Sequence, residues 1–323
     1  MALRRAAQRA VQQIGQQARL EESVLEQTVA CSPLAALSGA ITMDVAHASQ
    51  LAVKQQMRSV QNIQKITKAM KMVAASKMRV AQASTERSRG ITEPLVTLLG
   101  DLPAADVERN VAVAITSDKG LCGGINTTIS KVARGTATAT GGEGKQNSIV
   151  VIGEKGKAQL QRTNRNQIFS TMGDMAKIRI TFPLASAVSE ELLKTEYDAA
   201  RIMYNRFVSA ITFKPTLATV LSPDALERNA EAGSKIDTYE IEGSDRAELL
   251  QDLAEFNLAV TMYNGLLENS CSENASRMAA MDSSTNNASD LLSKLTLSYN
   301  RTRQAAITTE LTEIVSGAAA LEG

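Results

Sequence analysis

Several residue types that usually carry chemistry are scarce in this chain of 323 residues, which has no Trp, five Tyr, five Phe, one His and three Cys. A single histidine, His47, leaves little room for histidine-based catalysis or a His-rich metal site. The cysteines, Cys31, Cys122 and Cys271, are far apart and form no CxxC motif, so we expect reduced thiols. Aromatic residues make up 3% of the chain, which favours elongated helices meshed by Leu, Ala and Met.

Excess charge and long apolar runs are also lacking. The 35 basic and 34 acidic side chains leave a net charge of +1, which argues against a dedicated nucleic-acid-binding protein. The best apolar run, residues 95–99, is far shorter than the ~18–20 residues that span a bilayer. A hydrophobic fraction of 44% is enough for a globular core. We therefore expect a folded protein without a direct membrane span.

The first residues have the composition of a targeting sequence. Residues 1–20 contain four arginines and no acidic residue, and their apolar residues recur at helical spacing. This pattern is typical of a mitochondrial or plastid transit peptide, and the alternative is an ordinary surface helix. Residues 21–48 show no clear period and include a proline and a glycine. We assign residues 1–48 to a transit peptide and linker.

Long helical patterns follow this segment and close the chain. Residues 40–89 contain no glycine or proline, and the only glycine between Gly243 and Gly317 is Gly265. At 1.5 Å per residue, about 40 residues of helix would be ~60 Å long and about 70 residues ~105 Å long. Two such helices at opposite ends of one chain pair most simply as an antiparallel coiled coil. The sequence predicts these helices within residues 49–94 and 244–323, with a helix start at Ser244 and Asp245.

Each helix carries a heptad seam, in which residues alternate steps of three and four. The first predicted seam consists of Ile63, Ile66, Met70, Val73, Lys77 and Val80. The second begins with Leu249, Leu253, Phe256, Val260, Tyr263 and Leu267, takes one extra step of four to Cys271, and continues to Ala306.

The middle of the chain, residues 95–243, alternates strand and helix signals. Apolar runs predict strands at 111–117, 148–153, 199–208 and 216–221, and helical patterns cover 154–162 and 184–197. Such alternation indicates a Rossmann-like, three-layer α/β domain. The predicted fold class is therefore α+α/β, a long antiparallel coiled coil with an inserted α/β foot domain.

A glycine-rich loop, SDKGLCGGIN at residues 117–126, follows the first predicted strand. It matches neither GxxxxGK[ST] nor GxGxxG, because Lys119 precedes the glycines. Cys122 has no neighbouring histidine that would activate it as a nucleophile. We favour an exposed turn that serves as a contact surface over a nucleotide site.

The first long helix has uncompensated positive charge. Seven basic residues and no acidic residue lie between Val45 and Thr85. Nucleic acid, an anionic membrane or an acidic protein surface would each complement this charge. The absence of interleaved aromatics disfavours single-stranded nucleic acid. We interpret the helix as facing an acidic protein partner, with pairing to the acidic start of the last helix as the alternative.

Three segments resemble one known family strongly. They are residues 58–82 (RSVQNIQKITKAMKMVAASKMRVAQ), the loop SDKGLCGGIN, and most of residues 272–321. Together they are similar to the gamma subunit of F-type ATP synthases, over residues 50–321. The chain has no cysteine between Cys122 and Cys271, whereas plastid members carry a redox-active cysteine pair in the middle domain. With the arginine-rich leader, this points to a mitochondrial member, on the matrix side of the inner membrane.

The resemblance implies a non-catalytic rotor shaft. In the family, the coiled coil stands inside a ring of three alpha and three beta subunits. The α/β foot meets the delta or epsilon subunit and the ring of c subunits. Proton flow turns the c-ring and the shaft, and the asymmetric shaft drives each beta subunit in turn through its binding states. The resemblance implies no catalytic residue, no cofactor, no metal and no nucleic-acid partner for this chain.

The resemblance also assigns partner contacts. Residues of the first helix match the segment that faces acidic loops of the beta subunits, the glycine-rich loop matches a collar contact, and a polar pair on the last helix matches contacts to the beta catch loops. These predicted beta-subunit contacts are Lys68, Met70, Lys71, Lys119, Cys122, Arg303 and Gln304. The small apolar tip matches the end held in an apolar bearing, through Ile314, Val315, Ala318, Ala319 and Leu321.

Two other functions compete with the rotor. One is a coiled-coil scaffold whose α/β domain binds nucleotide or nucleic acid, and the other is an enzyme that uses the glycine-rich loop. Tight, stoichiometric ATP binding by the isolated chain would favour either of them.

Overall fold

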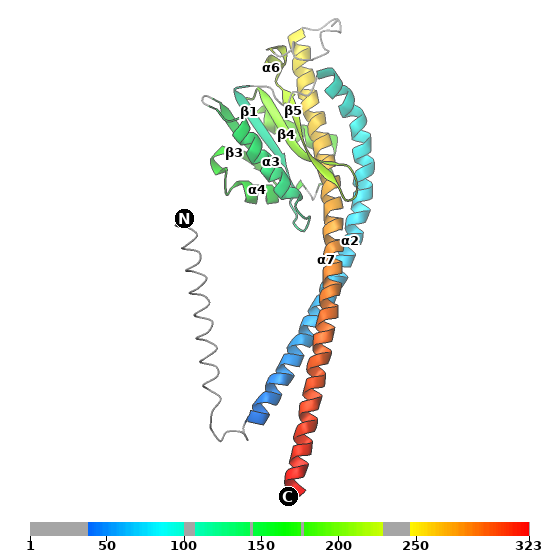
Figure 1. The fold of residues 1–323 in the computed structure, drawn as a ribbon. Helices are drawn as coiled ribbons and strands as arrows, with labels where there is room; N and C mark the ends of the chain where they lie inside the picture. The colour runs from blue at the N-terminus through cyan, green and yellow to red at the C-terminus, as the bar shows by residue number, and fades with distance from the viewer. Residues whose placement is uncertain (1–37, 100–106, 143–144, 176–177, 229–245, 323) are drawn as a thin grey trace, which may run out of the picture. The chain divides into compact units, whose positions relative to one another are not determined.

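The structure is a computed structural model that describes residues 38–99, 107–142, 145–175, 178–228 and 246–322, with side chains described within residues 50–225 and 246–321 of these ranges. The chain divides into two compact units. One holds the residues up to Ser59 together with those from Leu292, and the other runs from Val60 to Leu291. Two long helices, α2 (Ser38–Leu99) and α7 (Arg246–Glu322), contribute to both units (Figure 1).

A five-stranded sheet lies in the larger unit. Its spatial order is β3-β2-β1-β4-β5, with the first four strands parallel and β5 antiparallel to β4. The central strand β1 pairs with β2 and β4, so that Val113 lies between Val150 and Ile202. The strands are β1 (Arg109–Ile115), β2 (Gln146–Ile152), β3 (Ile168–Met172), β4 (Ala199–Phe207) and β5 (Phe213–Leu221).

Short helices lie between the strands and, in the case of α6, after the last strand. They are α3 (Ile125–Ala139), α4 (Glu154–Leu160), the 3-10 helix η1 (Arg165–Gln167), α5 (Phe182–Leu193) and α6 (Pro223–Arg228). The β1–α3–β2 connection places α3 against the sheet, as parallel neighbours require a crossover.

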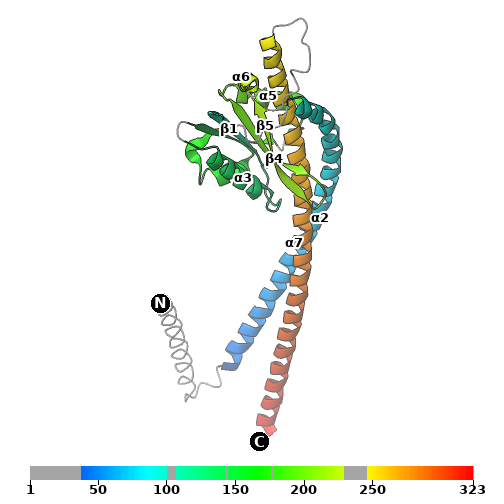
Figure 2. The same cartoon turned by 45° about the horizontal axis from the view of Figure 1, so that its top comes forward.

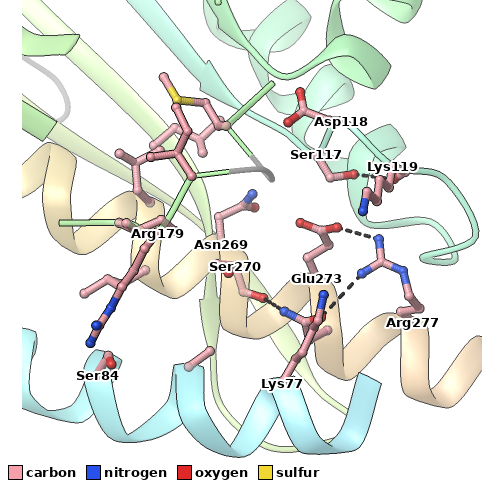
Figure 3. A pocket seen from close by; sticks show the side chains of 18 of the residues that line it. Lys77, Ser84, Ser117, Asp118, Lys119, Arg179, Asn269, Ser270, Glu273 and Arg277 are labelled. Atoms are coloured by element: carbon pink, nitrogen blue, oxygen red, sulfur yellow. Dashed lines mark hydrogen bonds and ion pairs between the residues drawn. The ribbon is translucent and has the colours of Figure 1, made fainter. Parts of the chain in front are cut away.

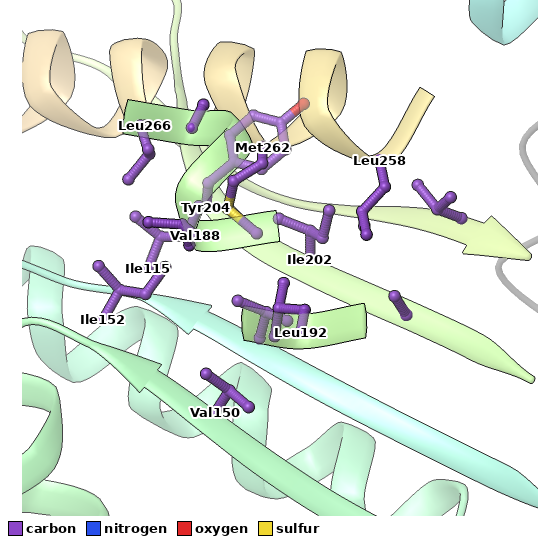
Figure 4. Packing of buried hydrophobic residues seen from close by; sticks show 14 of the residues in the cluster. Ile115, Val150, Ile152, Val188, Leu192, Ile202, Tyr204, Leu258, Met262 and Leu266 are labelled. Carbon is purple, nitrogen blue, oxygen red and sulfur yellow. The ribbon is translucent and has the colours of Figure 1, made fainter. Parts of the chain in front are cut away.

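Alternating side chains of β1 form two cores, one on each face of the sheet. On one face, Ala112 and Ala114 pack with Ile129 of α3 and Leu160 of α4. On the other face, β1 packs with side chains of α5 and α7 (Figure 4). The residues of α5 and α7 in this second core include Val188, Leu192, Leu258, Met262 and Leu266. The domain therefore has three layers, and the long helix α7 forms part of the third.

Gly265 allows α7 to lie close to the sheet. A Cβ atom at this position would come within 3.0 Å of Ile115 Cδ1 and 3.4 Å of Tyr204 Cδ1. Figures 1 and 2 agree that α7 and α2 run side by side beside the sheet in the larger unit. The middle of α7 is consequently buried on nearly all sides, from Asn257 to Asn269 apart from half-buried Tyr263.

The two long helices pair in antiparallel fashion within the larger unit, which confirms the predicted coiled coil. The bonded residues of α7 have higher sequence numbers where those of α2 have lower ones. Three cross-helix hydrogen bonds show this: Thr285 to Thr67 (2.8 Å), Lys71 to Asp282 (2.6 Å) and Ser88 to Asn264 (2.9 Å).

The predicted seam on α2 is wrong by one position. Ile63, Ile66, Val73 and Val80 are exposed, Val80 to 71%. The residues that face α7 instead include Thr67, Ala74, Thr85 and Ser88, which are buried. These side chains are small, and the hydroxyls of Thr67, Thr85 and Ser88 can donate hydrogen bonds, so they form the contact although they are less hydrophobic. A one-residue shift rotates the stripe by about 100°, which leaves the larger aliphatic residues facing outward.

The predicted seam on α7 is confirmed over much of its length. Val260, Leu267, Cys271, Met281 and Ala288 are all buried. The first predicted residues, Leu249 and Phe256, are exposed. Phe256 nevertheless lies against the ring of Phe182 on α5, with ring centroids 6.2 Å apart.

The other elements agree with prediction to within a few residues, with exceptions. The predicted strands correspond to β1, β2, β4 and β5, and β3 and α6 were not predicted. Helix α2 begins at Ser38, inside the predicted linker, and continues past Pro94 to Leu99. The predicted helix start at Ser244 and Asp245 and the transit peptide up to residue 37 lie outside the described residues. None of the helices in the described part of the chain is long and apolar enough to cross a membrane.

Cys271 is a packing residue in the contact between helices and sheet. It is buried with Phe207 and Ala275, and Met78 and Ala81 of α2 pack against this cluster. Burial, reinforced by the negative charge of Glu268, raises the pKa of the Cys271 thiol to about 12. The folded thiol therefore stays protonated at neutral pH.

A substitution at Gly153 tests the packing at the end of β2. Its φ is +104°, and a Cβ would lie 2.6 Å from the carbonyl oxygen of Thr116. We expect Gly153→Ala to lower the free energy of unfolding by about 2 kcal/mol or more, because the clash adds to backbone strain. Gly135→Ala is the matched control, since its Cβ would meet nothing within 4 Å in helix α3. That change should raise stability by about 0.5–1 kcal/mol in urea unfolding. Equal stability of the two variants would contradict this account.

Thiol labelling tests the buried cysteines. In a Cys31→Ser variant, we expect Cys122 and Cys271 to resist alkylation at pH 8 in the folded protein and to react fully in urea, because both are buried. The raised pKa of Cys271 also predicts that the free energy of unfolding depends on pH. The thiol keeps its proton in the folded state while the unfolded thiol loses it near its ordinary value of 9.0, so stability should fall from pH 9 toward pH 12. Rapid labelling of the folded chain would refute the burial.

Candidate functional site

The predicted site residues are divided between the two compact units. Lys68, Met70, Lys71 and the glycine-rich loop lie in the larger unit, and Arg303, Gln304 and the tip lie in the smaller one. Within the described ranges, no group of three or more His, Cys, Asp or Glu side chains is arranged to hold a metal ion. The candidate site is therefore a set of surfaces.

The first surface is on α2. Lys68 is exposed and Met70 is half-buried. Lys71 Nζ lies 2.6 Å from Asp282 Oδ1 of α7, and both side chains are about half accessible to solvent. This ion pair shows that the alternative interpretation, charge complementarity between the two helices, applies to Lys71. Lys68 follows Ile66 by two residues and therefore lies about 200° further round α2, away from the exposed aliphatic stripe.

The second surface is the loop between β1 and α3, which is held by an internal hydrogen-bond network. The Asn126 side chain accepts the Ser117 N–H (3.0 Å) and donates to Ser117 Oγ (2.8 Å) and to Cys122 Sγ (3.3 Å). Ser117 Oγ also donates to the carbonyl of Lys119 (2.8 Å). Leu121 and Gly123 complete the turn with φ values of +62° and +61°.

This network decides which loop residues face outward. The Cys122 thiol points into the network and the residue is only 2% exposed. Lys119 and Leu121 point outward, and Leu121 is 64% exposed. Sequence reasoning missed Leu121, although a large apolar residue between glycines in a polar loop is a usable signal. Of the two predicted loop contacts, Lys119 alone presents its side chain to solvent.

A cleft of about 490 Å³ opens where β1 ends, between the sheet and the two long helices. Figure 3 shows Asp118 and Lys119 from the loop, Lys77 from α2, and Glu273 and Arg277 from α7 around it. Sheets with parallel strands often bind ligands at this edge. Here the Arg277 guanidinium is bonded to Glu273, and Asp118 Oδ1 accepts the backbone N–H of Glu154 (3.2 Å). The side chains of Asp118, Glu273 and Arg277 are thus already bonded to other groups of this chain.

An internal charge pair joins the helices to the sheet, and the sequence analysis did not identify it. Arg89 on α2 donates from Nε and Nη2 to the two carboxylate oxygens of Glu268 on α7, at 2.6 and 3.0 Å. Glu268 is 1% exposed and also accepts the N–H of Phe207 at 2.7 Å. Arg89 Nη2 donates to the Phe207 carbonyl at 2.7 Å. The hydrogen bond to Glu268 raises the pKa of Arg89, so the guanidinium keeps its positive charge.

The third surface is the C-terminal part of α7, in the smaller unit. Arg303 and Gln304 are exposed, next to half-buried Thr302 and Ala306. From Leu311 to Leu321 every side chain is exposed, and Leu321 is 90% exposed. The predicted bearing residues all lie on this helix end: Ile314, Val315, Ala318, Ala319 and Leu321. An exposed, small-apolar helix end of this kind is suited to a socket on another protein.

Comparison with known proteins gives a consistent result. The family model described as ATP synthase matches residues 49–321. The chain is 51% identical over 276 residues to "ATP synthase subunit gamma, mitochondrial" of Ipomoea batatas, covering 84% of this chain and 85% of that protein. It is 48% identical over 316 residues to the protein of the same name in Arabidopsis thaliana, covering 94% and 97%.

The fold is also found among solved structures. A chain in the cryo-EM structure of the Euglena gracilis mitochondrial ATP synthase, OSCP/F1/c-ring in rotational state 3, matches with a TM-score of 0.74. The match covers 85% of this chain and 95% of that chain at 21% identity, so it supports the fold alone. The family model and the two plant relatives carry the assignment: this chain belongs to the family of ATP synthase gamma subunits.

Proposed function

We propose that this chain is the non-catalytic rotor shaft of a mitochondrial ATP synthase. It couples rotation of the membrane c-ring to the cycling of the catalytic beta subunits through their binding states. It works on the matrix side of the inner membrane as a peripheral part of the complex. The observation that carries this proposal, beside family membership, is the single helix α7. It is a packed layer of the α/β domain in its first part and ends in a run of exposed side chains.

The proposed division of the chain follows from these helices. Residues 1–48 are the transit peptide and linker, 49–94 and 244–323 form the shaft, and 95–243 form the foot. The foot is the part that meets the delta and epsilon subunits and the c-ring. The Euglena structure of similar fold includes F1 and c-ring components, which supports such partners.

The head of alpha and beta subunits is the proposed partner of α2. Lys68 and Met70 belong to the segment that faces acidic loops of the beta subunits. Lys71 belongs to the same surface, but its ammonium group is also paired with Asp282. Attraction between exposed charges of this kind speeds association, and it becomes weaker as the salt concentration rises.

The loop between β1 and α3 is the proposed collar contact below the head. Lys119 and Leu121 make the contact with their side chains, and Cys122 supports them from inside the loop. The mutual bonding of Ser117, Asn126 and Cys122 favours this role over phosphate binding. The same observation argues against the enzyme alternative, which needs the loop to hold a ligand.

The last part of α7 provides the proposed contacts within the head. Arg303 and Gln304 donate hydrogen bonds to the beta catch loops, since a guanidinium and an amide both suit carboxylate and carbonyl acceptors. The tip sits in an apolar bearing. Because apolar contact is non-directional, a tip of small aliphatic residues can turn in such a socket without locking.

The polar pair on α7 is tested by a double variant. We expect Arg303→Ala with Gln304→Ala to slow ATP turnover of the reconstituted complex roughly tenfold, equivalent to about 1.4 kcal/mol of transition-state stabilisation. Assembly should be unchanged, because both side chains are exposed in the isolated chain.

The matched control is Asn300→Ala with Arg301→Ala, which also removes one amide and one guanidinium, from neighbouring exposed positions. This control should keep most of the turnover. Equal rates for the two double variants would contradict the proposed role of Arg303 and Gln304.

Nucleotide binding separates the rotor from its alternatives. We expect isothermal titration of the isolated chain with ATP and magnesium to show no binding at millimolar ATP, because Ser117 and Asn126 are bonded to each other. Stoichiometric, tight ATP binding by the folded chain would overturn the non-catalytic shaft and favour the scaffold or enzyme function.

A further inference from the structure

Three polar residues on α7, spaced four apart, bond the main chain of the α/β domain. Glu268 accepts the N–H of Phe207 (2.7 Å), Ser272 Oγ donates to the carbonyl of Asn205 (2.8 Å), and Ser276 Oγ donates to the carbonyl of Cys122 (2.6 Å). We call Glu268, Ser272 and Ser276 the polar ladder. Residues four apart share one face of a helix, so the ladder follows a single line along α7.

Two further groups brace this line. Arg89 of α2 binds both carboxylate oxygens of Glu268 and the Phe207 carbonyl, which ties the second helix to the same strand end. Asn205 Nδ2 donates to Asn269 Oδ1 of α7 at 3.0 Å. The end of β4 is therefore bonded to α7 and α2 at once, and the loop after β1 is bonded to α7.

The ladder differs in kind from the preceding contact between α7 and the sheet. That contact is made by Leu258, Met262 and Leu266, which pack in an apolar core. Apolar packing is non-directional, whereas a hydrogen bond weakens steeply when its geometry is distorted. A twist of α7 about its axis moves its side chains sideways across the sheet. The apolar core can accommodate such sliding, but the ladder bonds cannot be kept without moving the strand end.

The ladder also occupies a particular level along α7. Ser276 marks the level of the β1–α3 loop, and further along α7 the side chains of Asp282 and Thr285 bond α2 through Lys71 and Thr67. Helix α7 already pairs with α2 at Asn264, so the ladder lies where α7 leaves the α/β domain while its contact with α2 continues. Torque entering through the foot must cross this level to reach the rest of the shaft.

We propose that the polar ladder, braced by Arg89, is the torque-transmitting joint between the foot and the coiled coil. The proposal rests on the proposed rotor function. Stability alone does not account for the Arg89–Glu268 pair in this joint, because a buried charge pair can often be replaced by apolar residues without loss of stability. Directional bonds to the main chain provide what apolar packing lacks, a fixed rotational register between foot and shaft.

Angular fluctuations of the assembled complex test the joint. The full chain, with Cys31→Ser and Lys131→Cys for a probe on exposed α3 of the foot, is reconstituted with alpha and beta subunits, and the head is immobilised. Torsional stiffness is taken from the spread of probe angles in the stalled state. We expect Ser272→Ala with Ser276→Ala to lower this stiffness about twofold, since two of the three directional bonds of the ladder are lost.

Ser283→Ala with Ser284→Ala is the matched control, because it makes the same chemical change on α7 away from the ladder. It should leave the stiffness unchanged. Stiffness of the ladder variant equal to that of the control overturns the proposal. If the ladder variant does not assemble, Ser276→Ala alone, at a half-buried position, gives the same comparison with a smaller expected fall.

The two proposals fail in different ways. A wild-type complex that assembles but whose probe never turns during ATP hydrolysis overturns the rotor function, and the joint with it. A wild-type complex that turns normally, with a ladder variant that is as stiff as the control, overturns the joint alone.

Discussion

The buried ion pair between Arg89 and Glu268 joins three elements that are far apart in sequence. One carboxylate oxygen accepts Arg89 Nε, and the other accepts Arg89 Nη2 and the N–H of Phe207. A buried carboxylate is costly unless its acceptor sites are filled by good donors, and here they are. Because the three donors come from α2 and from the end of β4, the pair can form only when both helices and the sheet are in place.

That constraint makes one helix serve two purposes. Helix α7 completes the apolar core of the α/β domain through Leu258, Met262 and Leu266. It also pairs with α2 through small and polar side chains such as Thr67, Thr85 and Ser88. Gly265 lets it lie close enough to the sheet for both. The foot and the start of the shaft therefore share a helix, as a rotor that carries torque from one to the other requires.

Much of this fold follows from local patterns in the sequence. The apolar runs within 111–117 and 148–153 predict strands because parallel, doubly covered strands are continuously hydrophobic. The lack of glycine and proline predicts the long helices, and two such helices in one chain predict their antiparallel pairing. Strand β3 escaped prediction because IFSTM is short and only partly buried. The seam on α2 was misplaced because hydrophobicity marks the outward stripe of Ile63 and Val80, whereas the contact with α7 uses small residues.

The site was predictable to different degrees for physical reasons. The exposure of Lys68, Lys119, Arg303 and the tip agrees with roles as contacts, which remain proposals. The inward orientation of Cys122 depends on its bonds to Ser117 and Asn126, which no spacing rule reveals. The joint was invisible to pattern analysis, because Glu268 falls beside the predicted seam and its partners, Arg89 and Phe207, are 179 and 61 residues away in sequence.

The most direct test of the account is a cryo-EM structure of the assembled complex resolved in several rotational states. The account predicts that α2 and α7 stand at the centre of the alpha and beta head in each state. It also predicts that the Arg89, Glu268 and Phe207 contacts are the same in all states while the beta subunits around the shaft differ. A chain at the periphery of the complex, or contacts that break and re-form between rotational states, would contradict a shaft and foot that turn as one body.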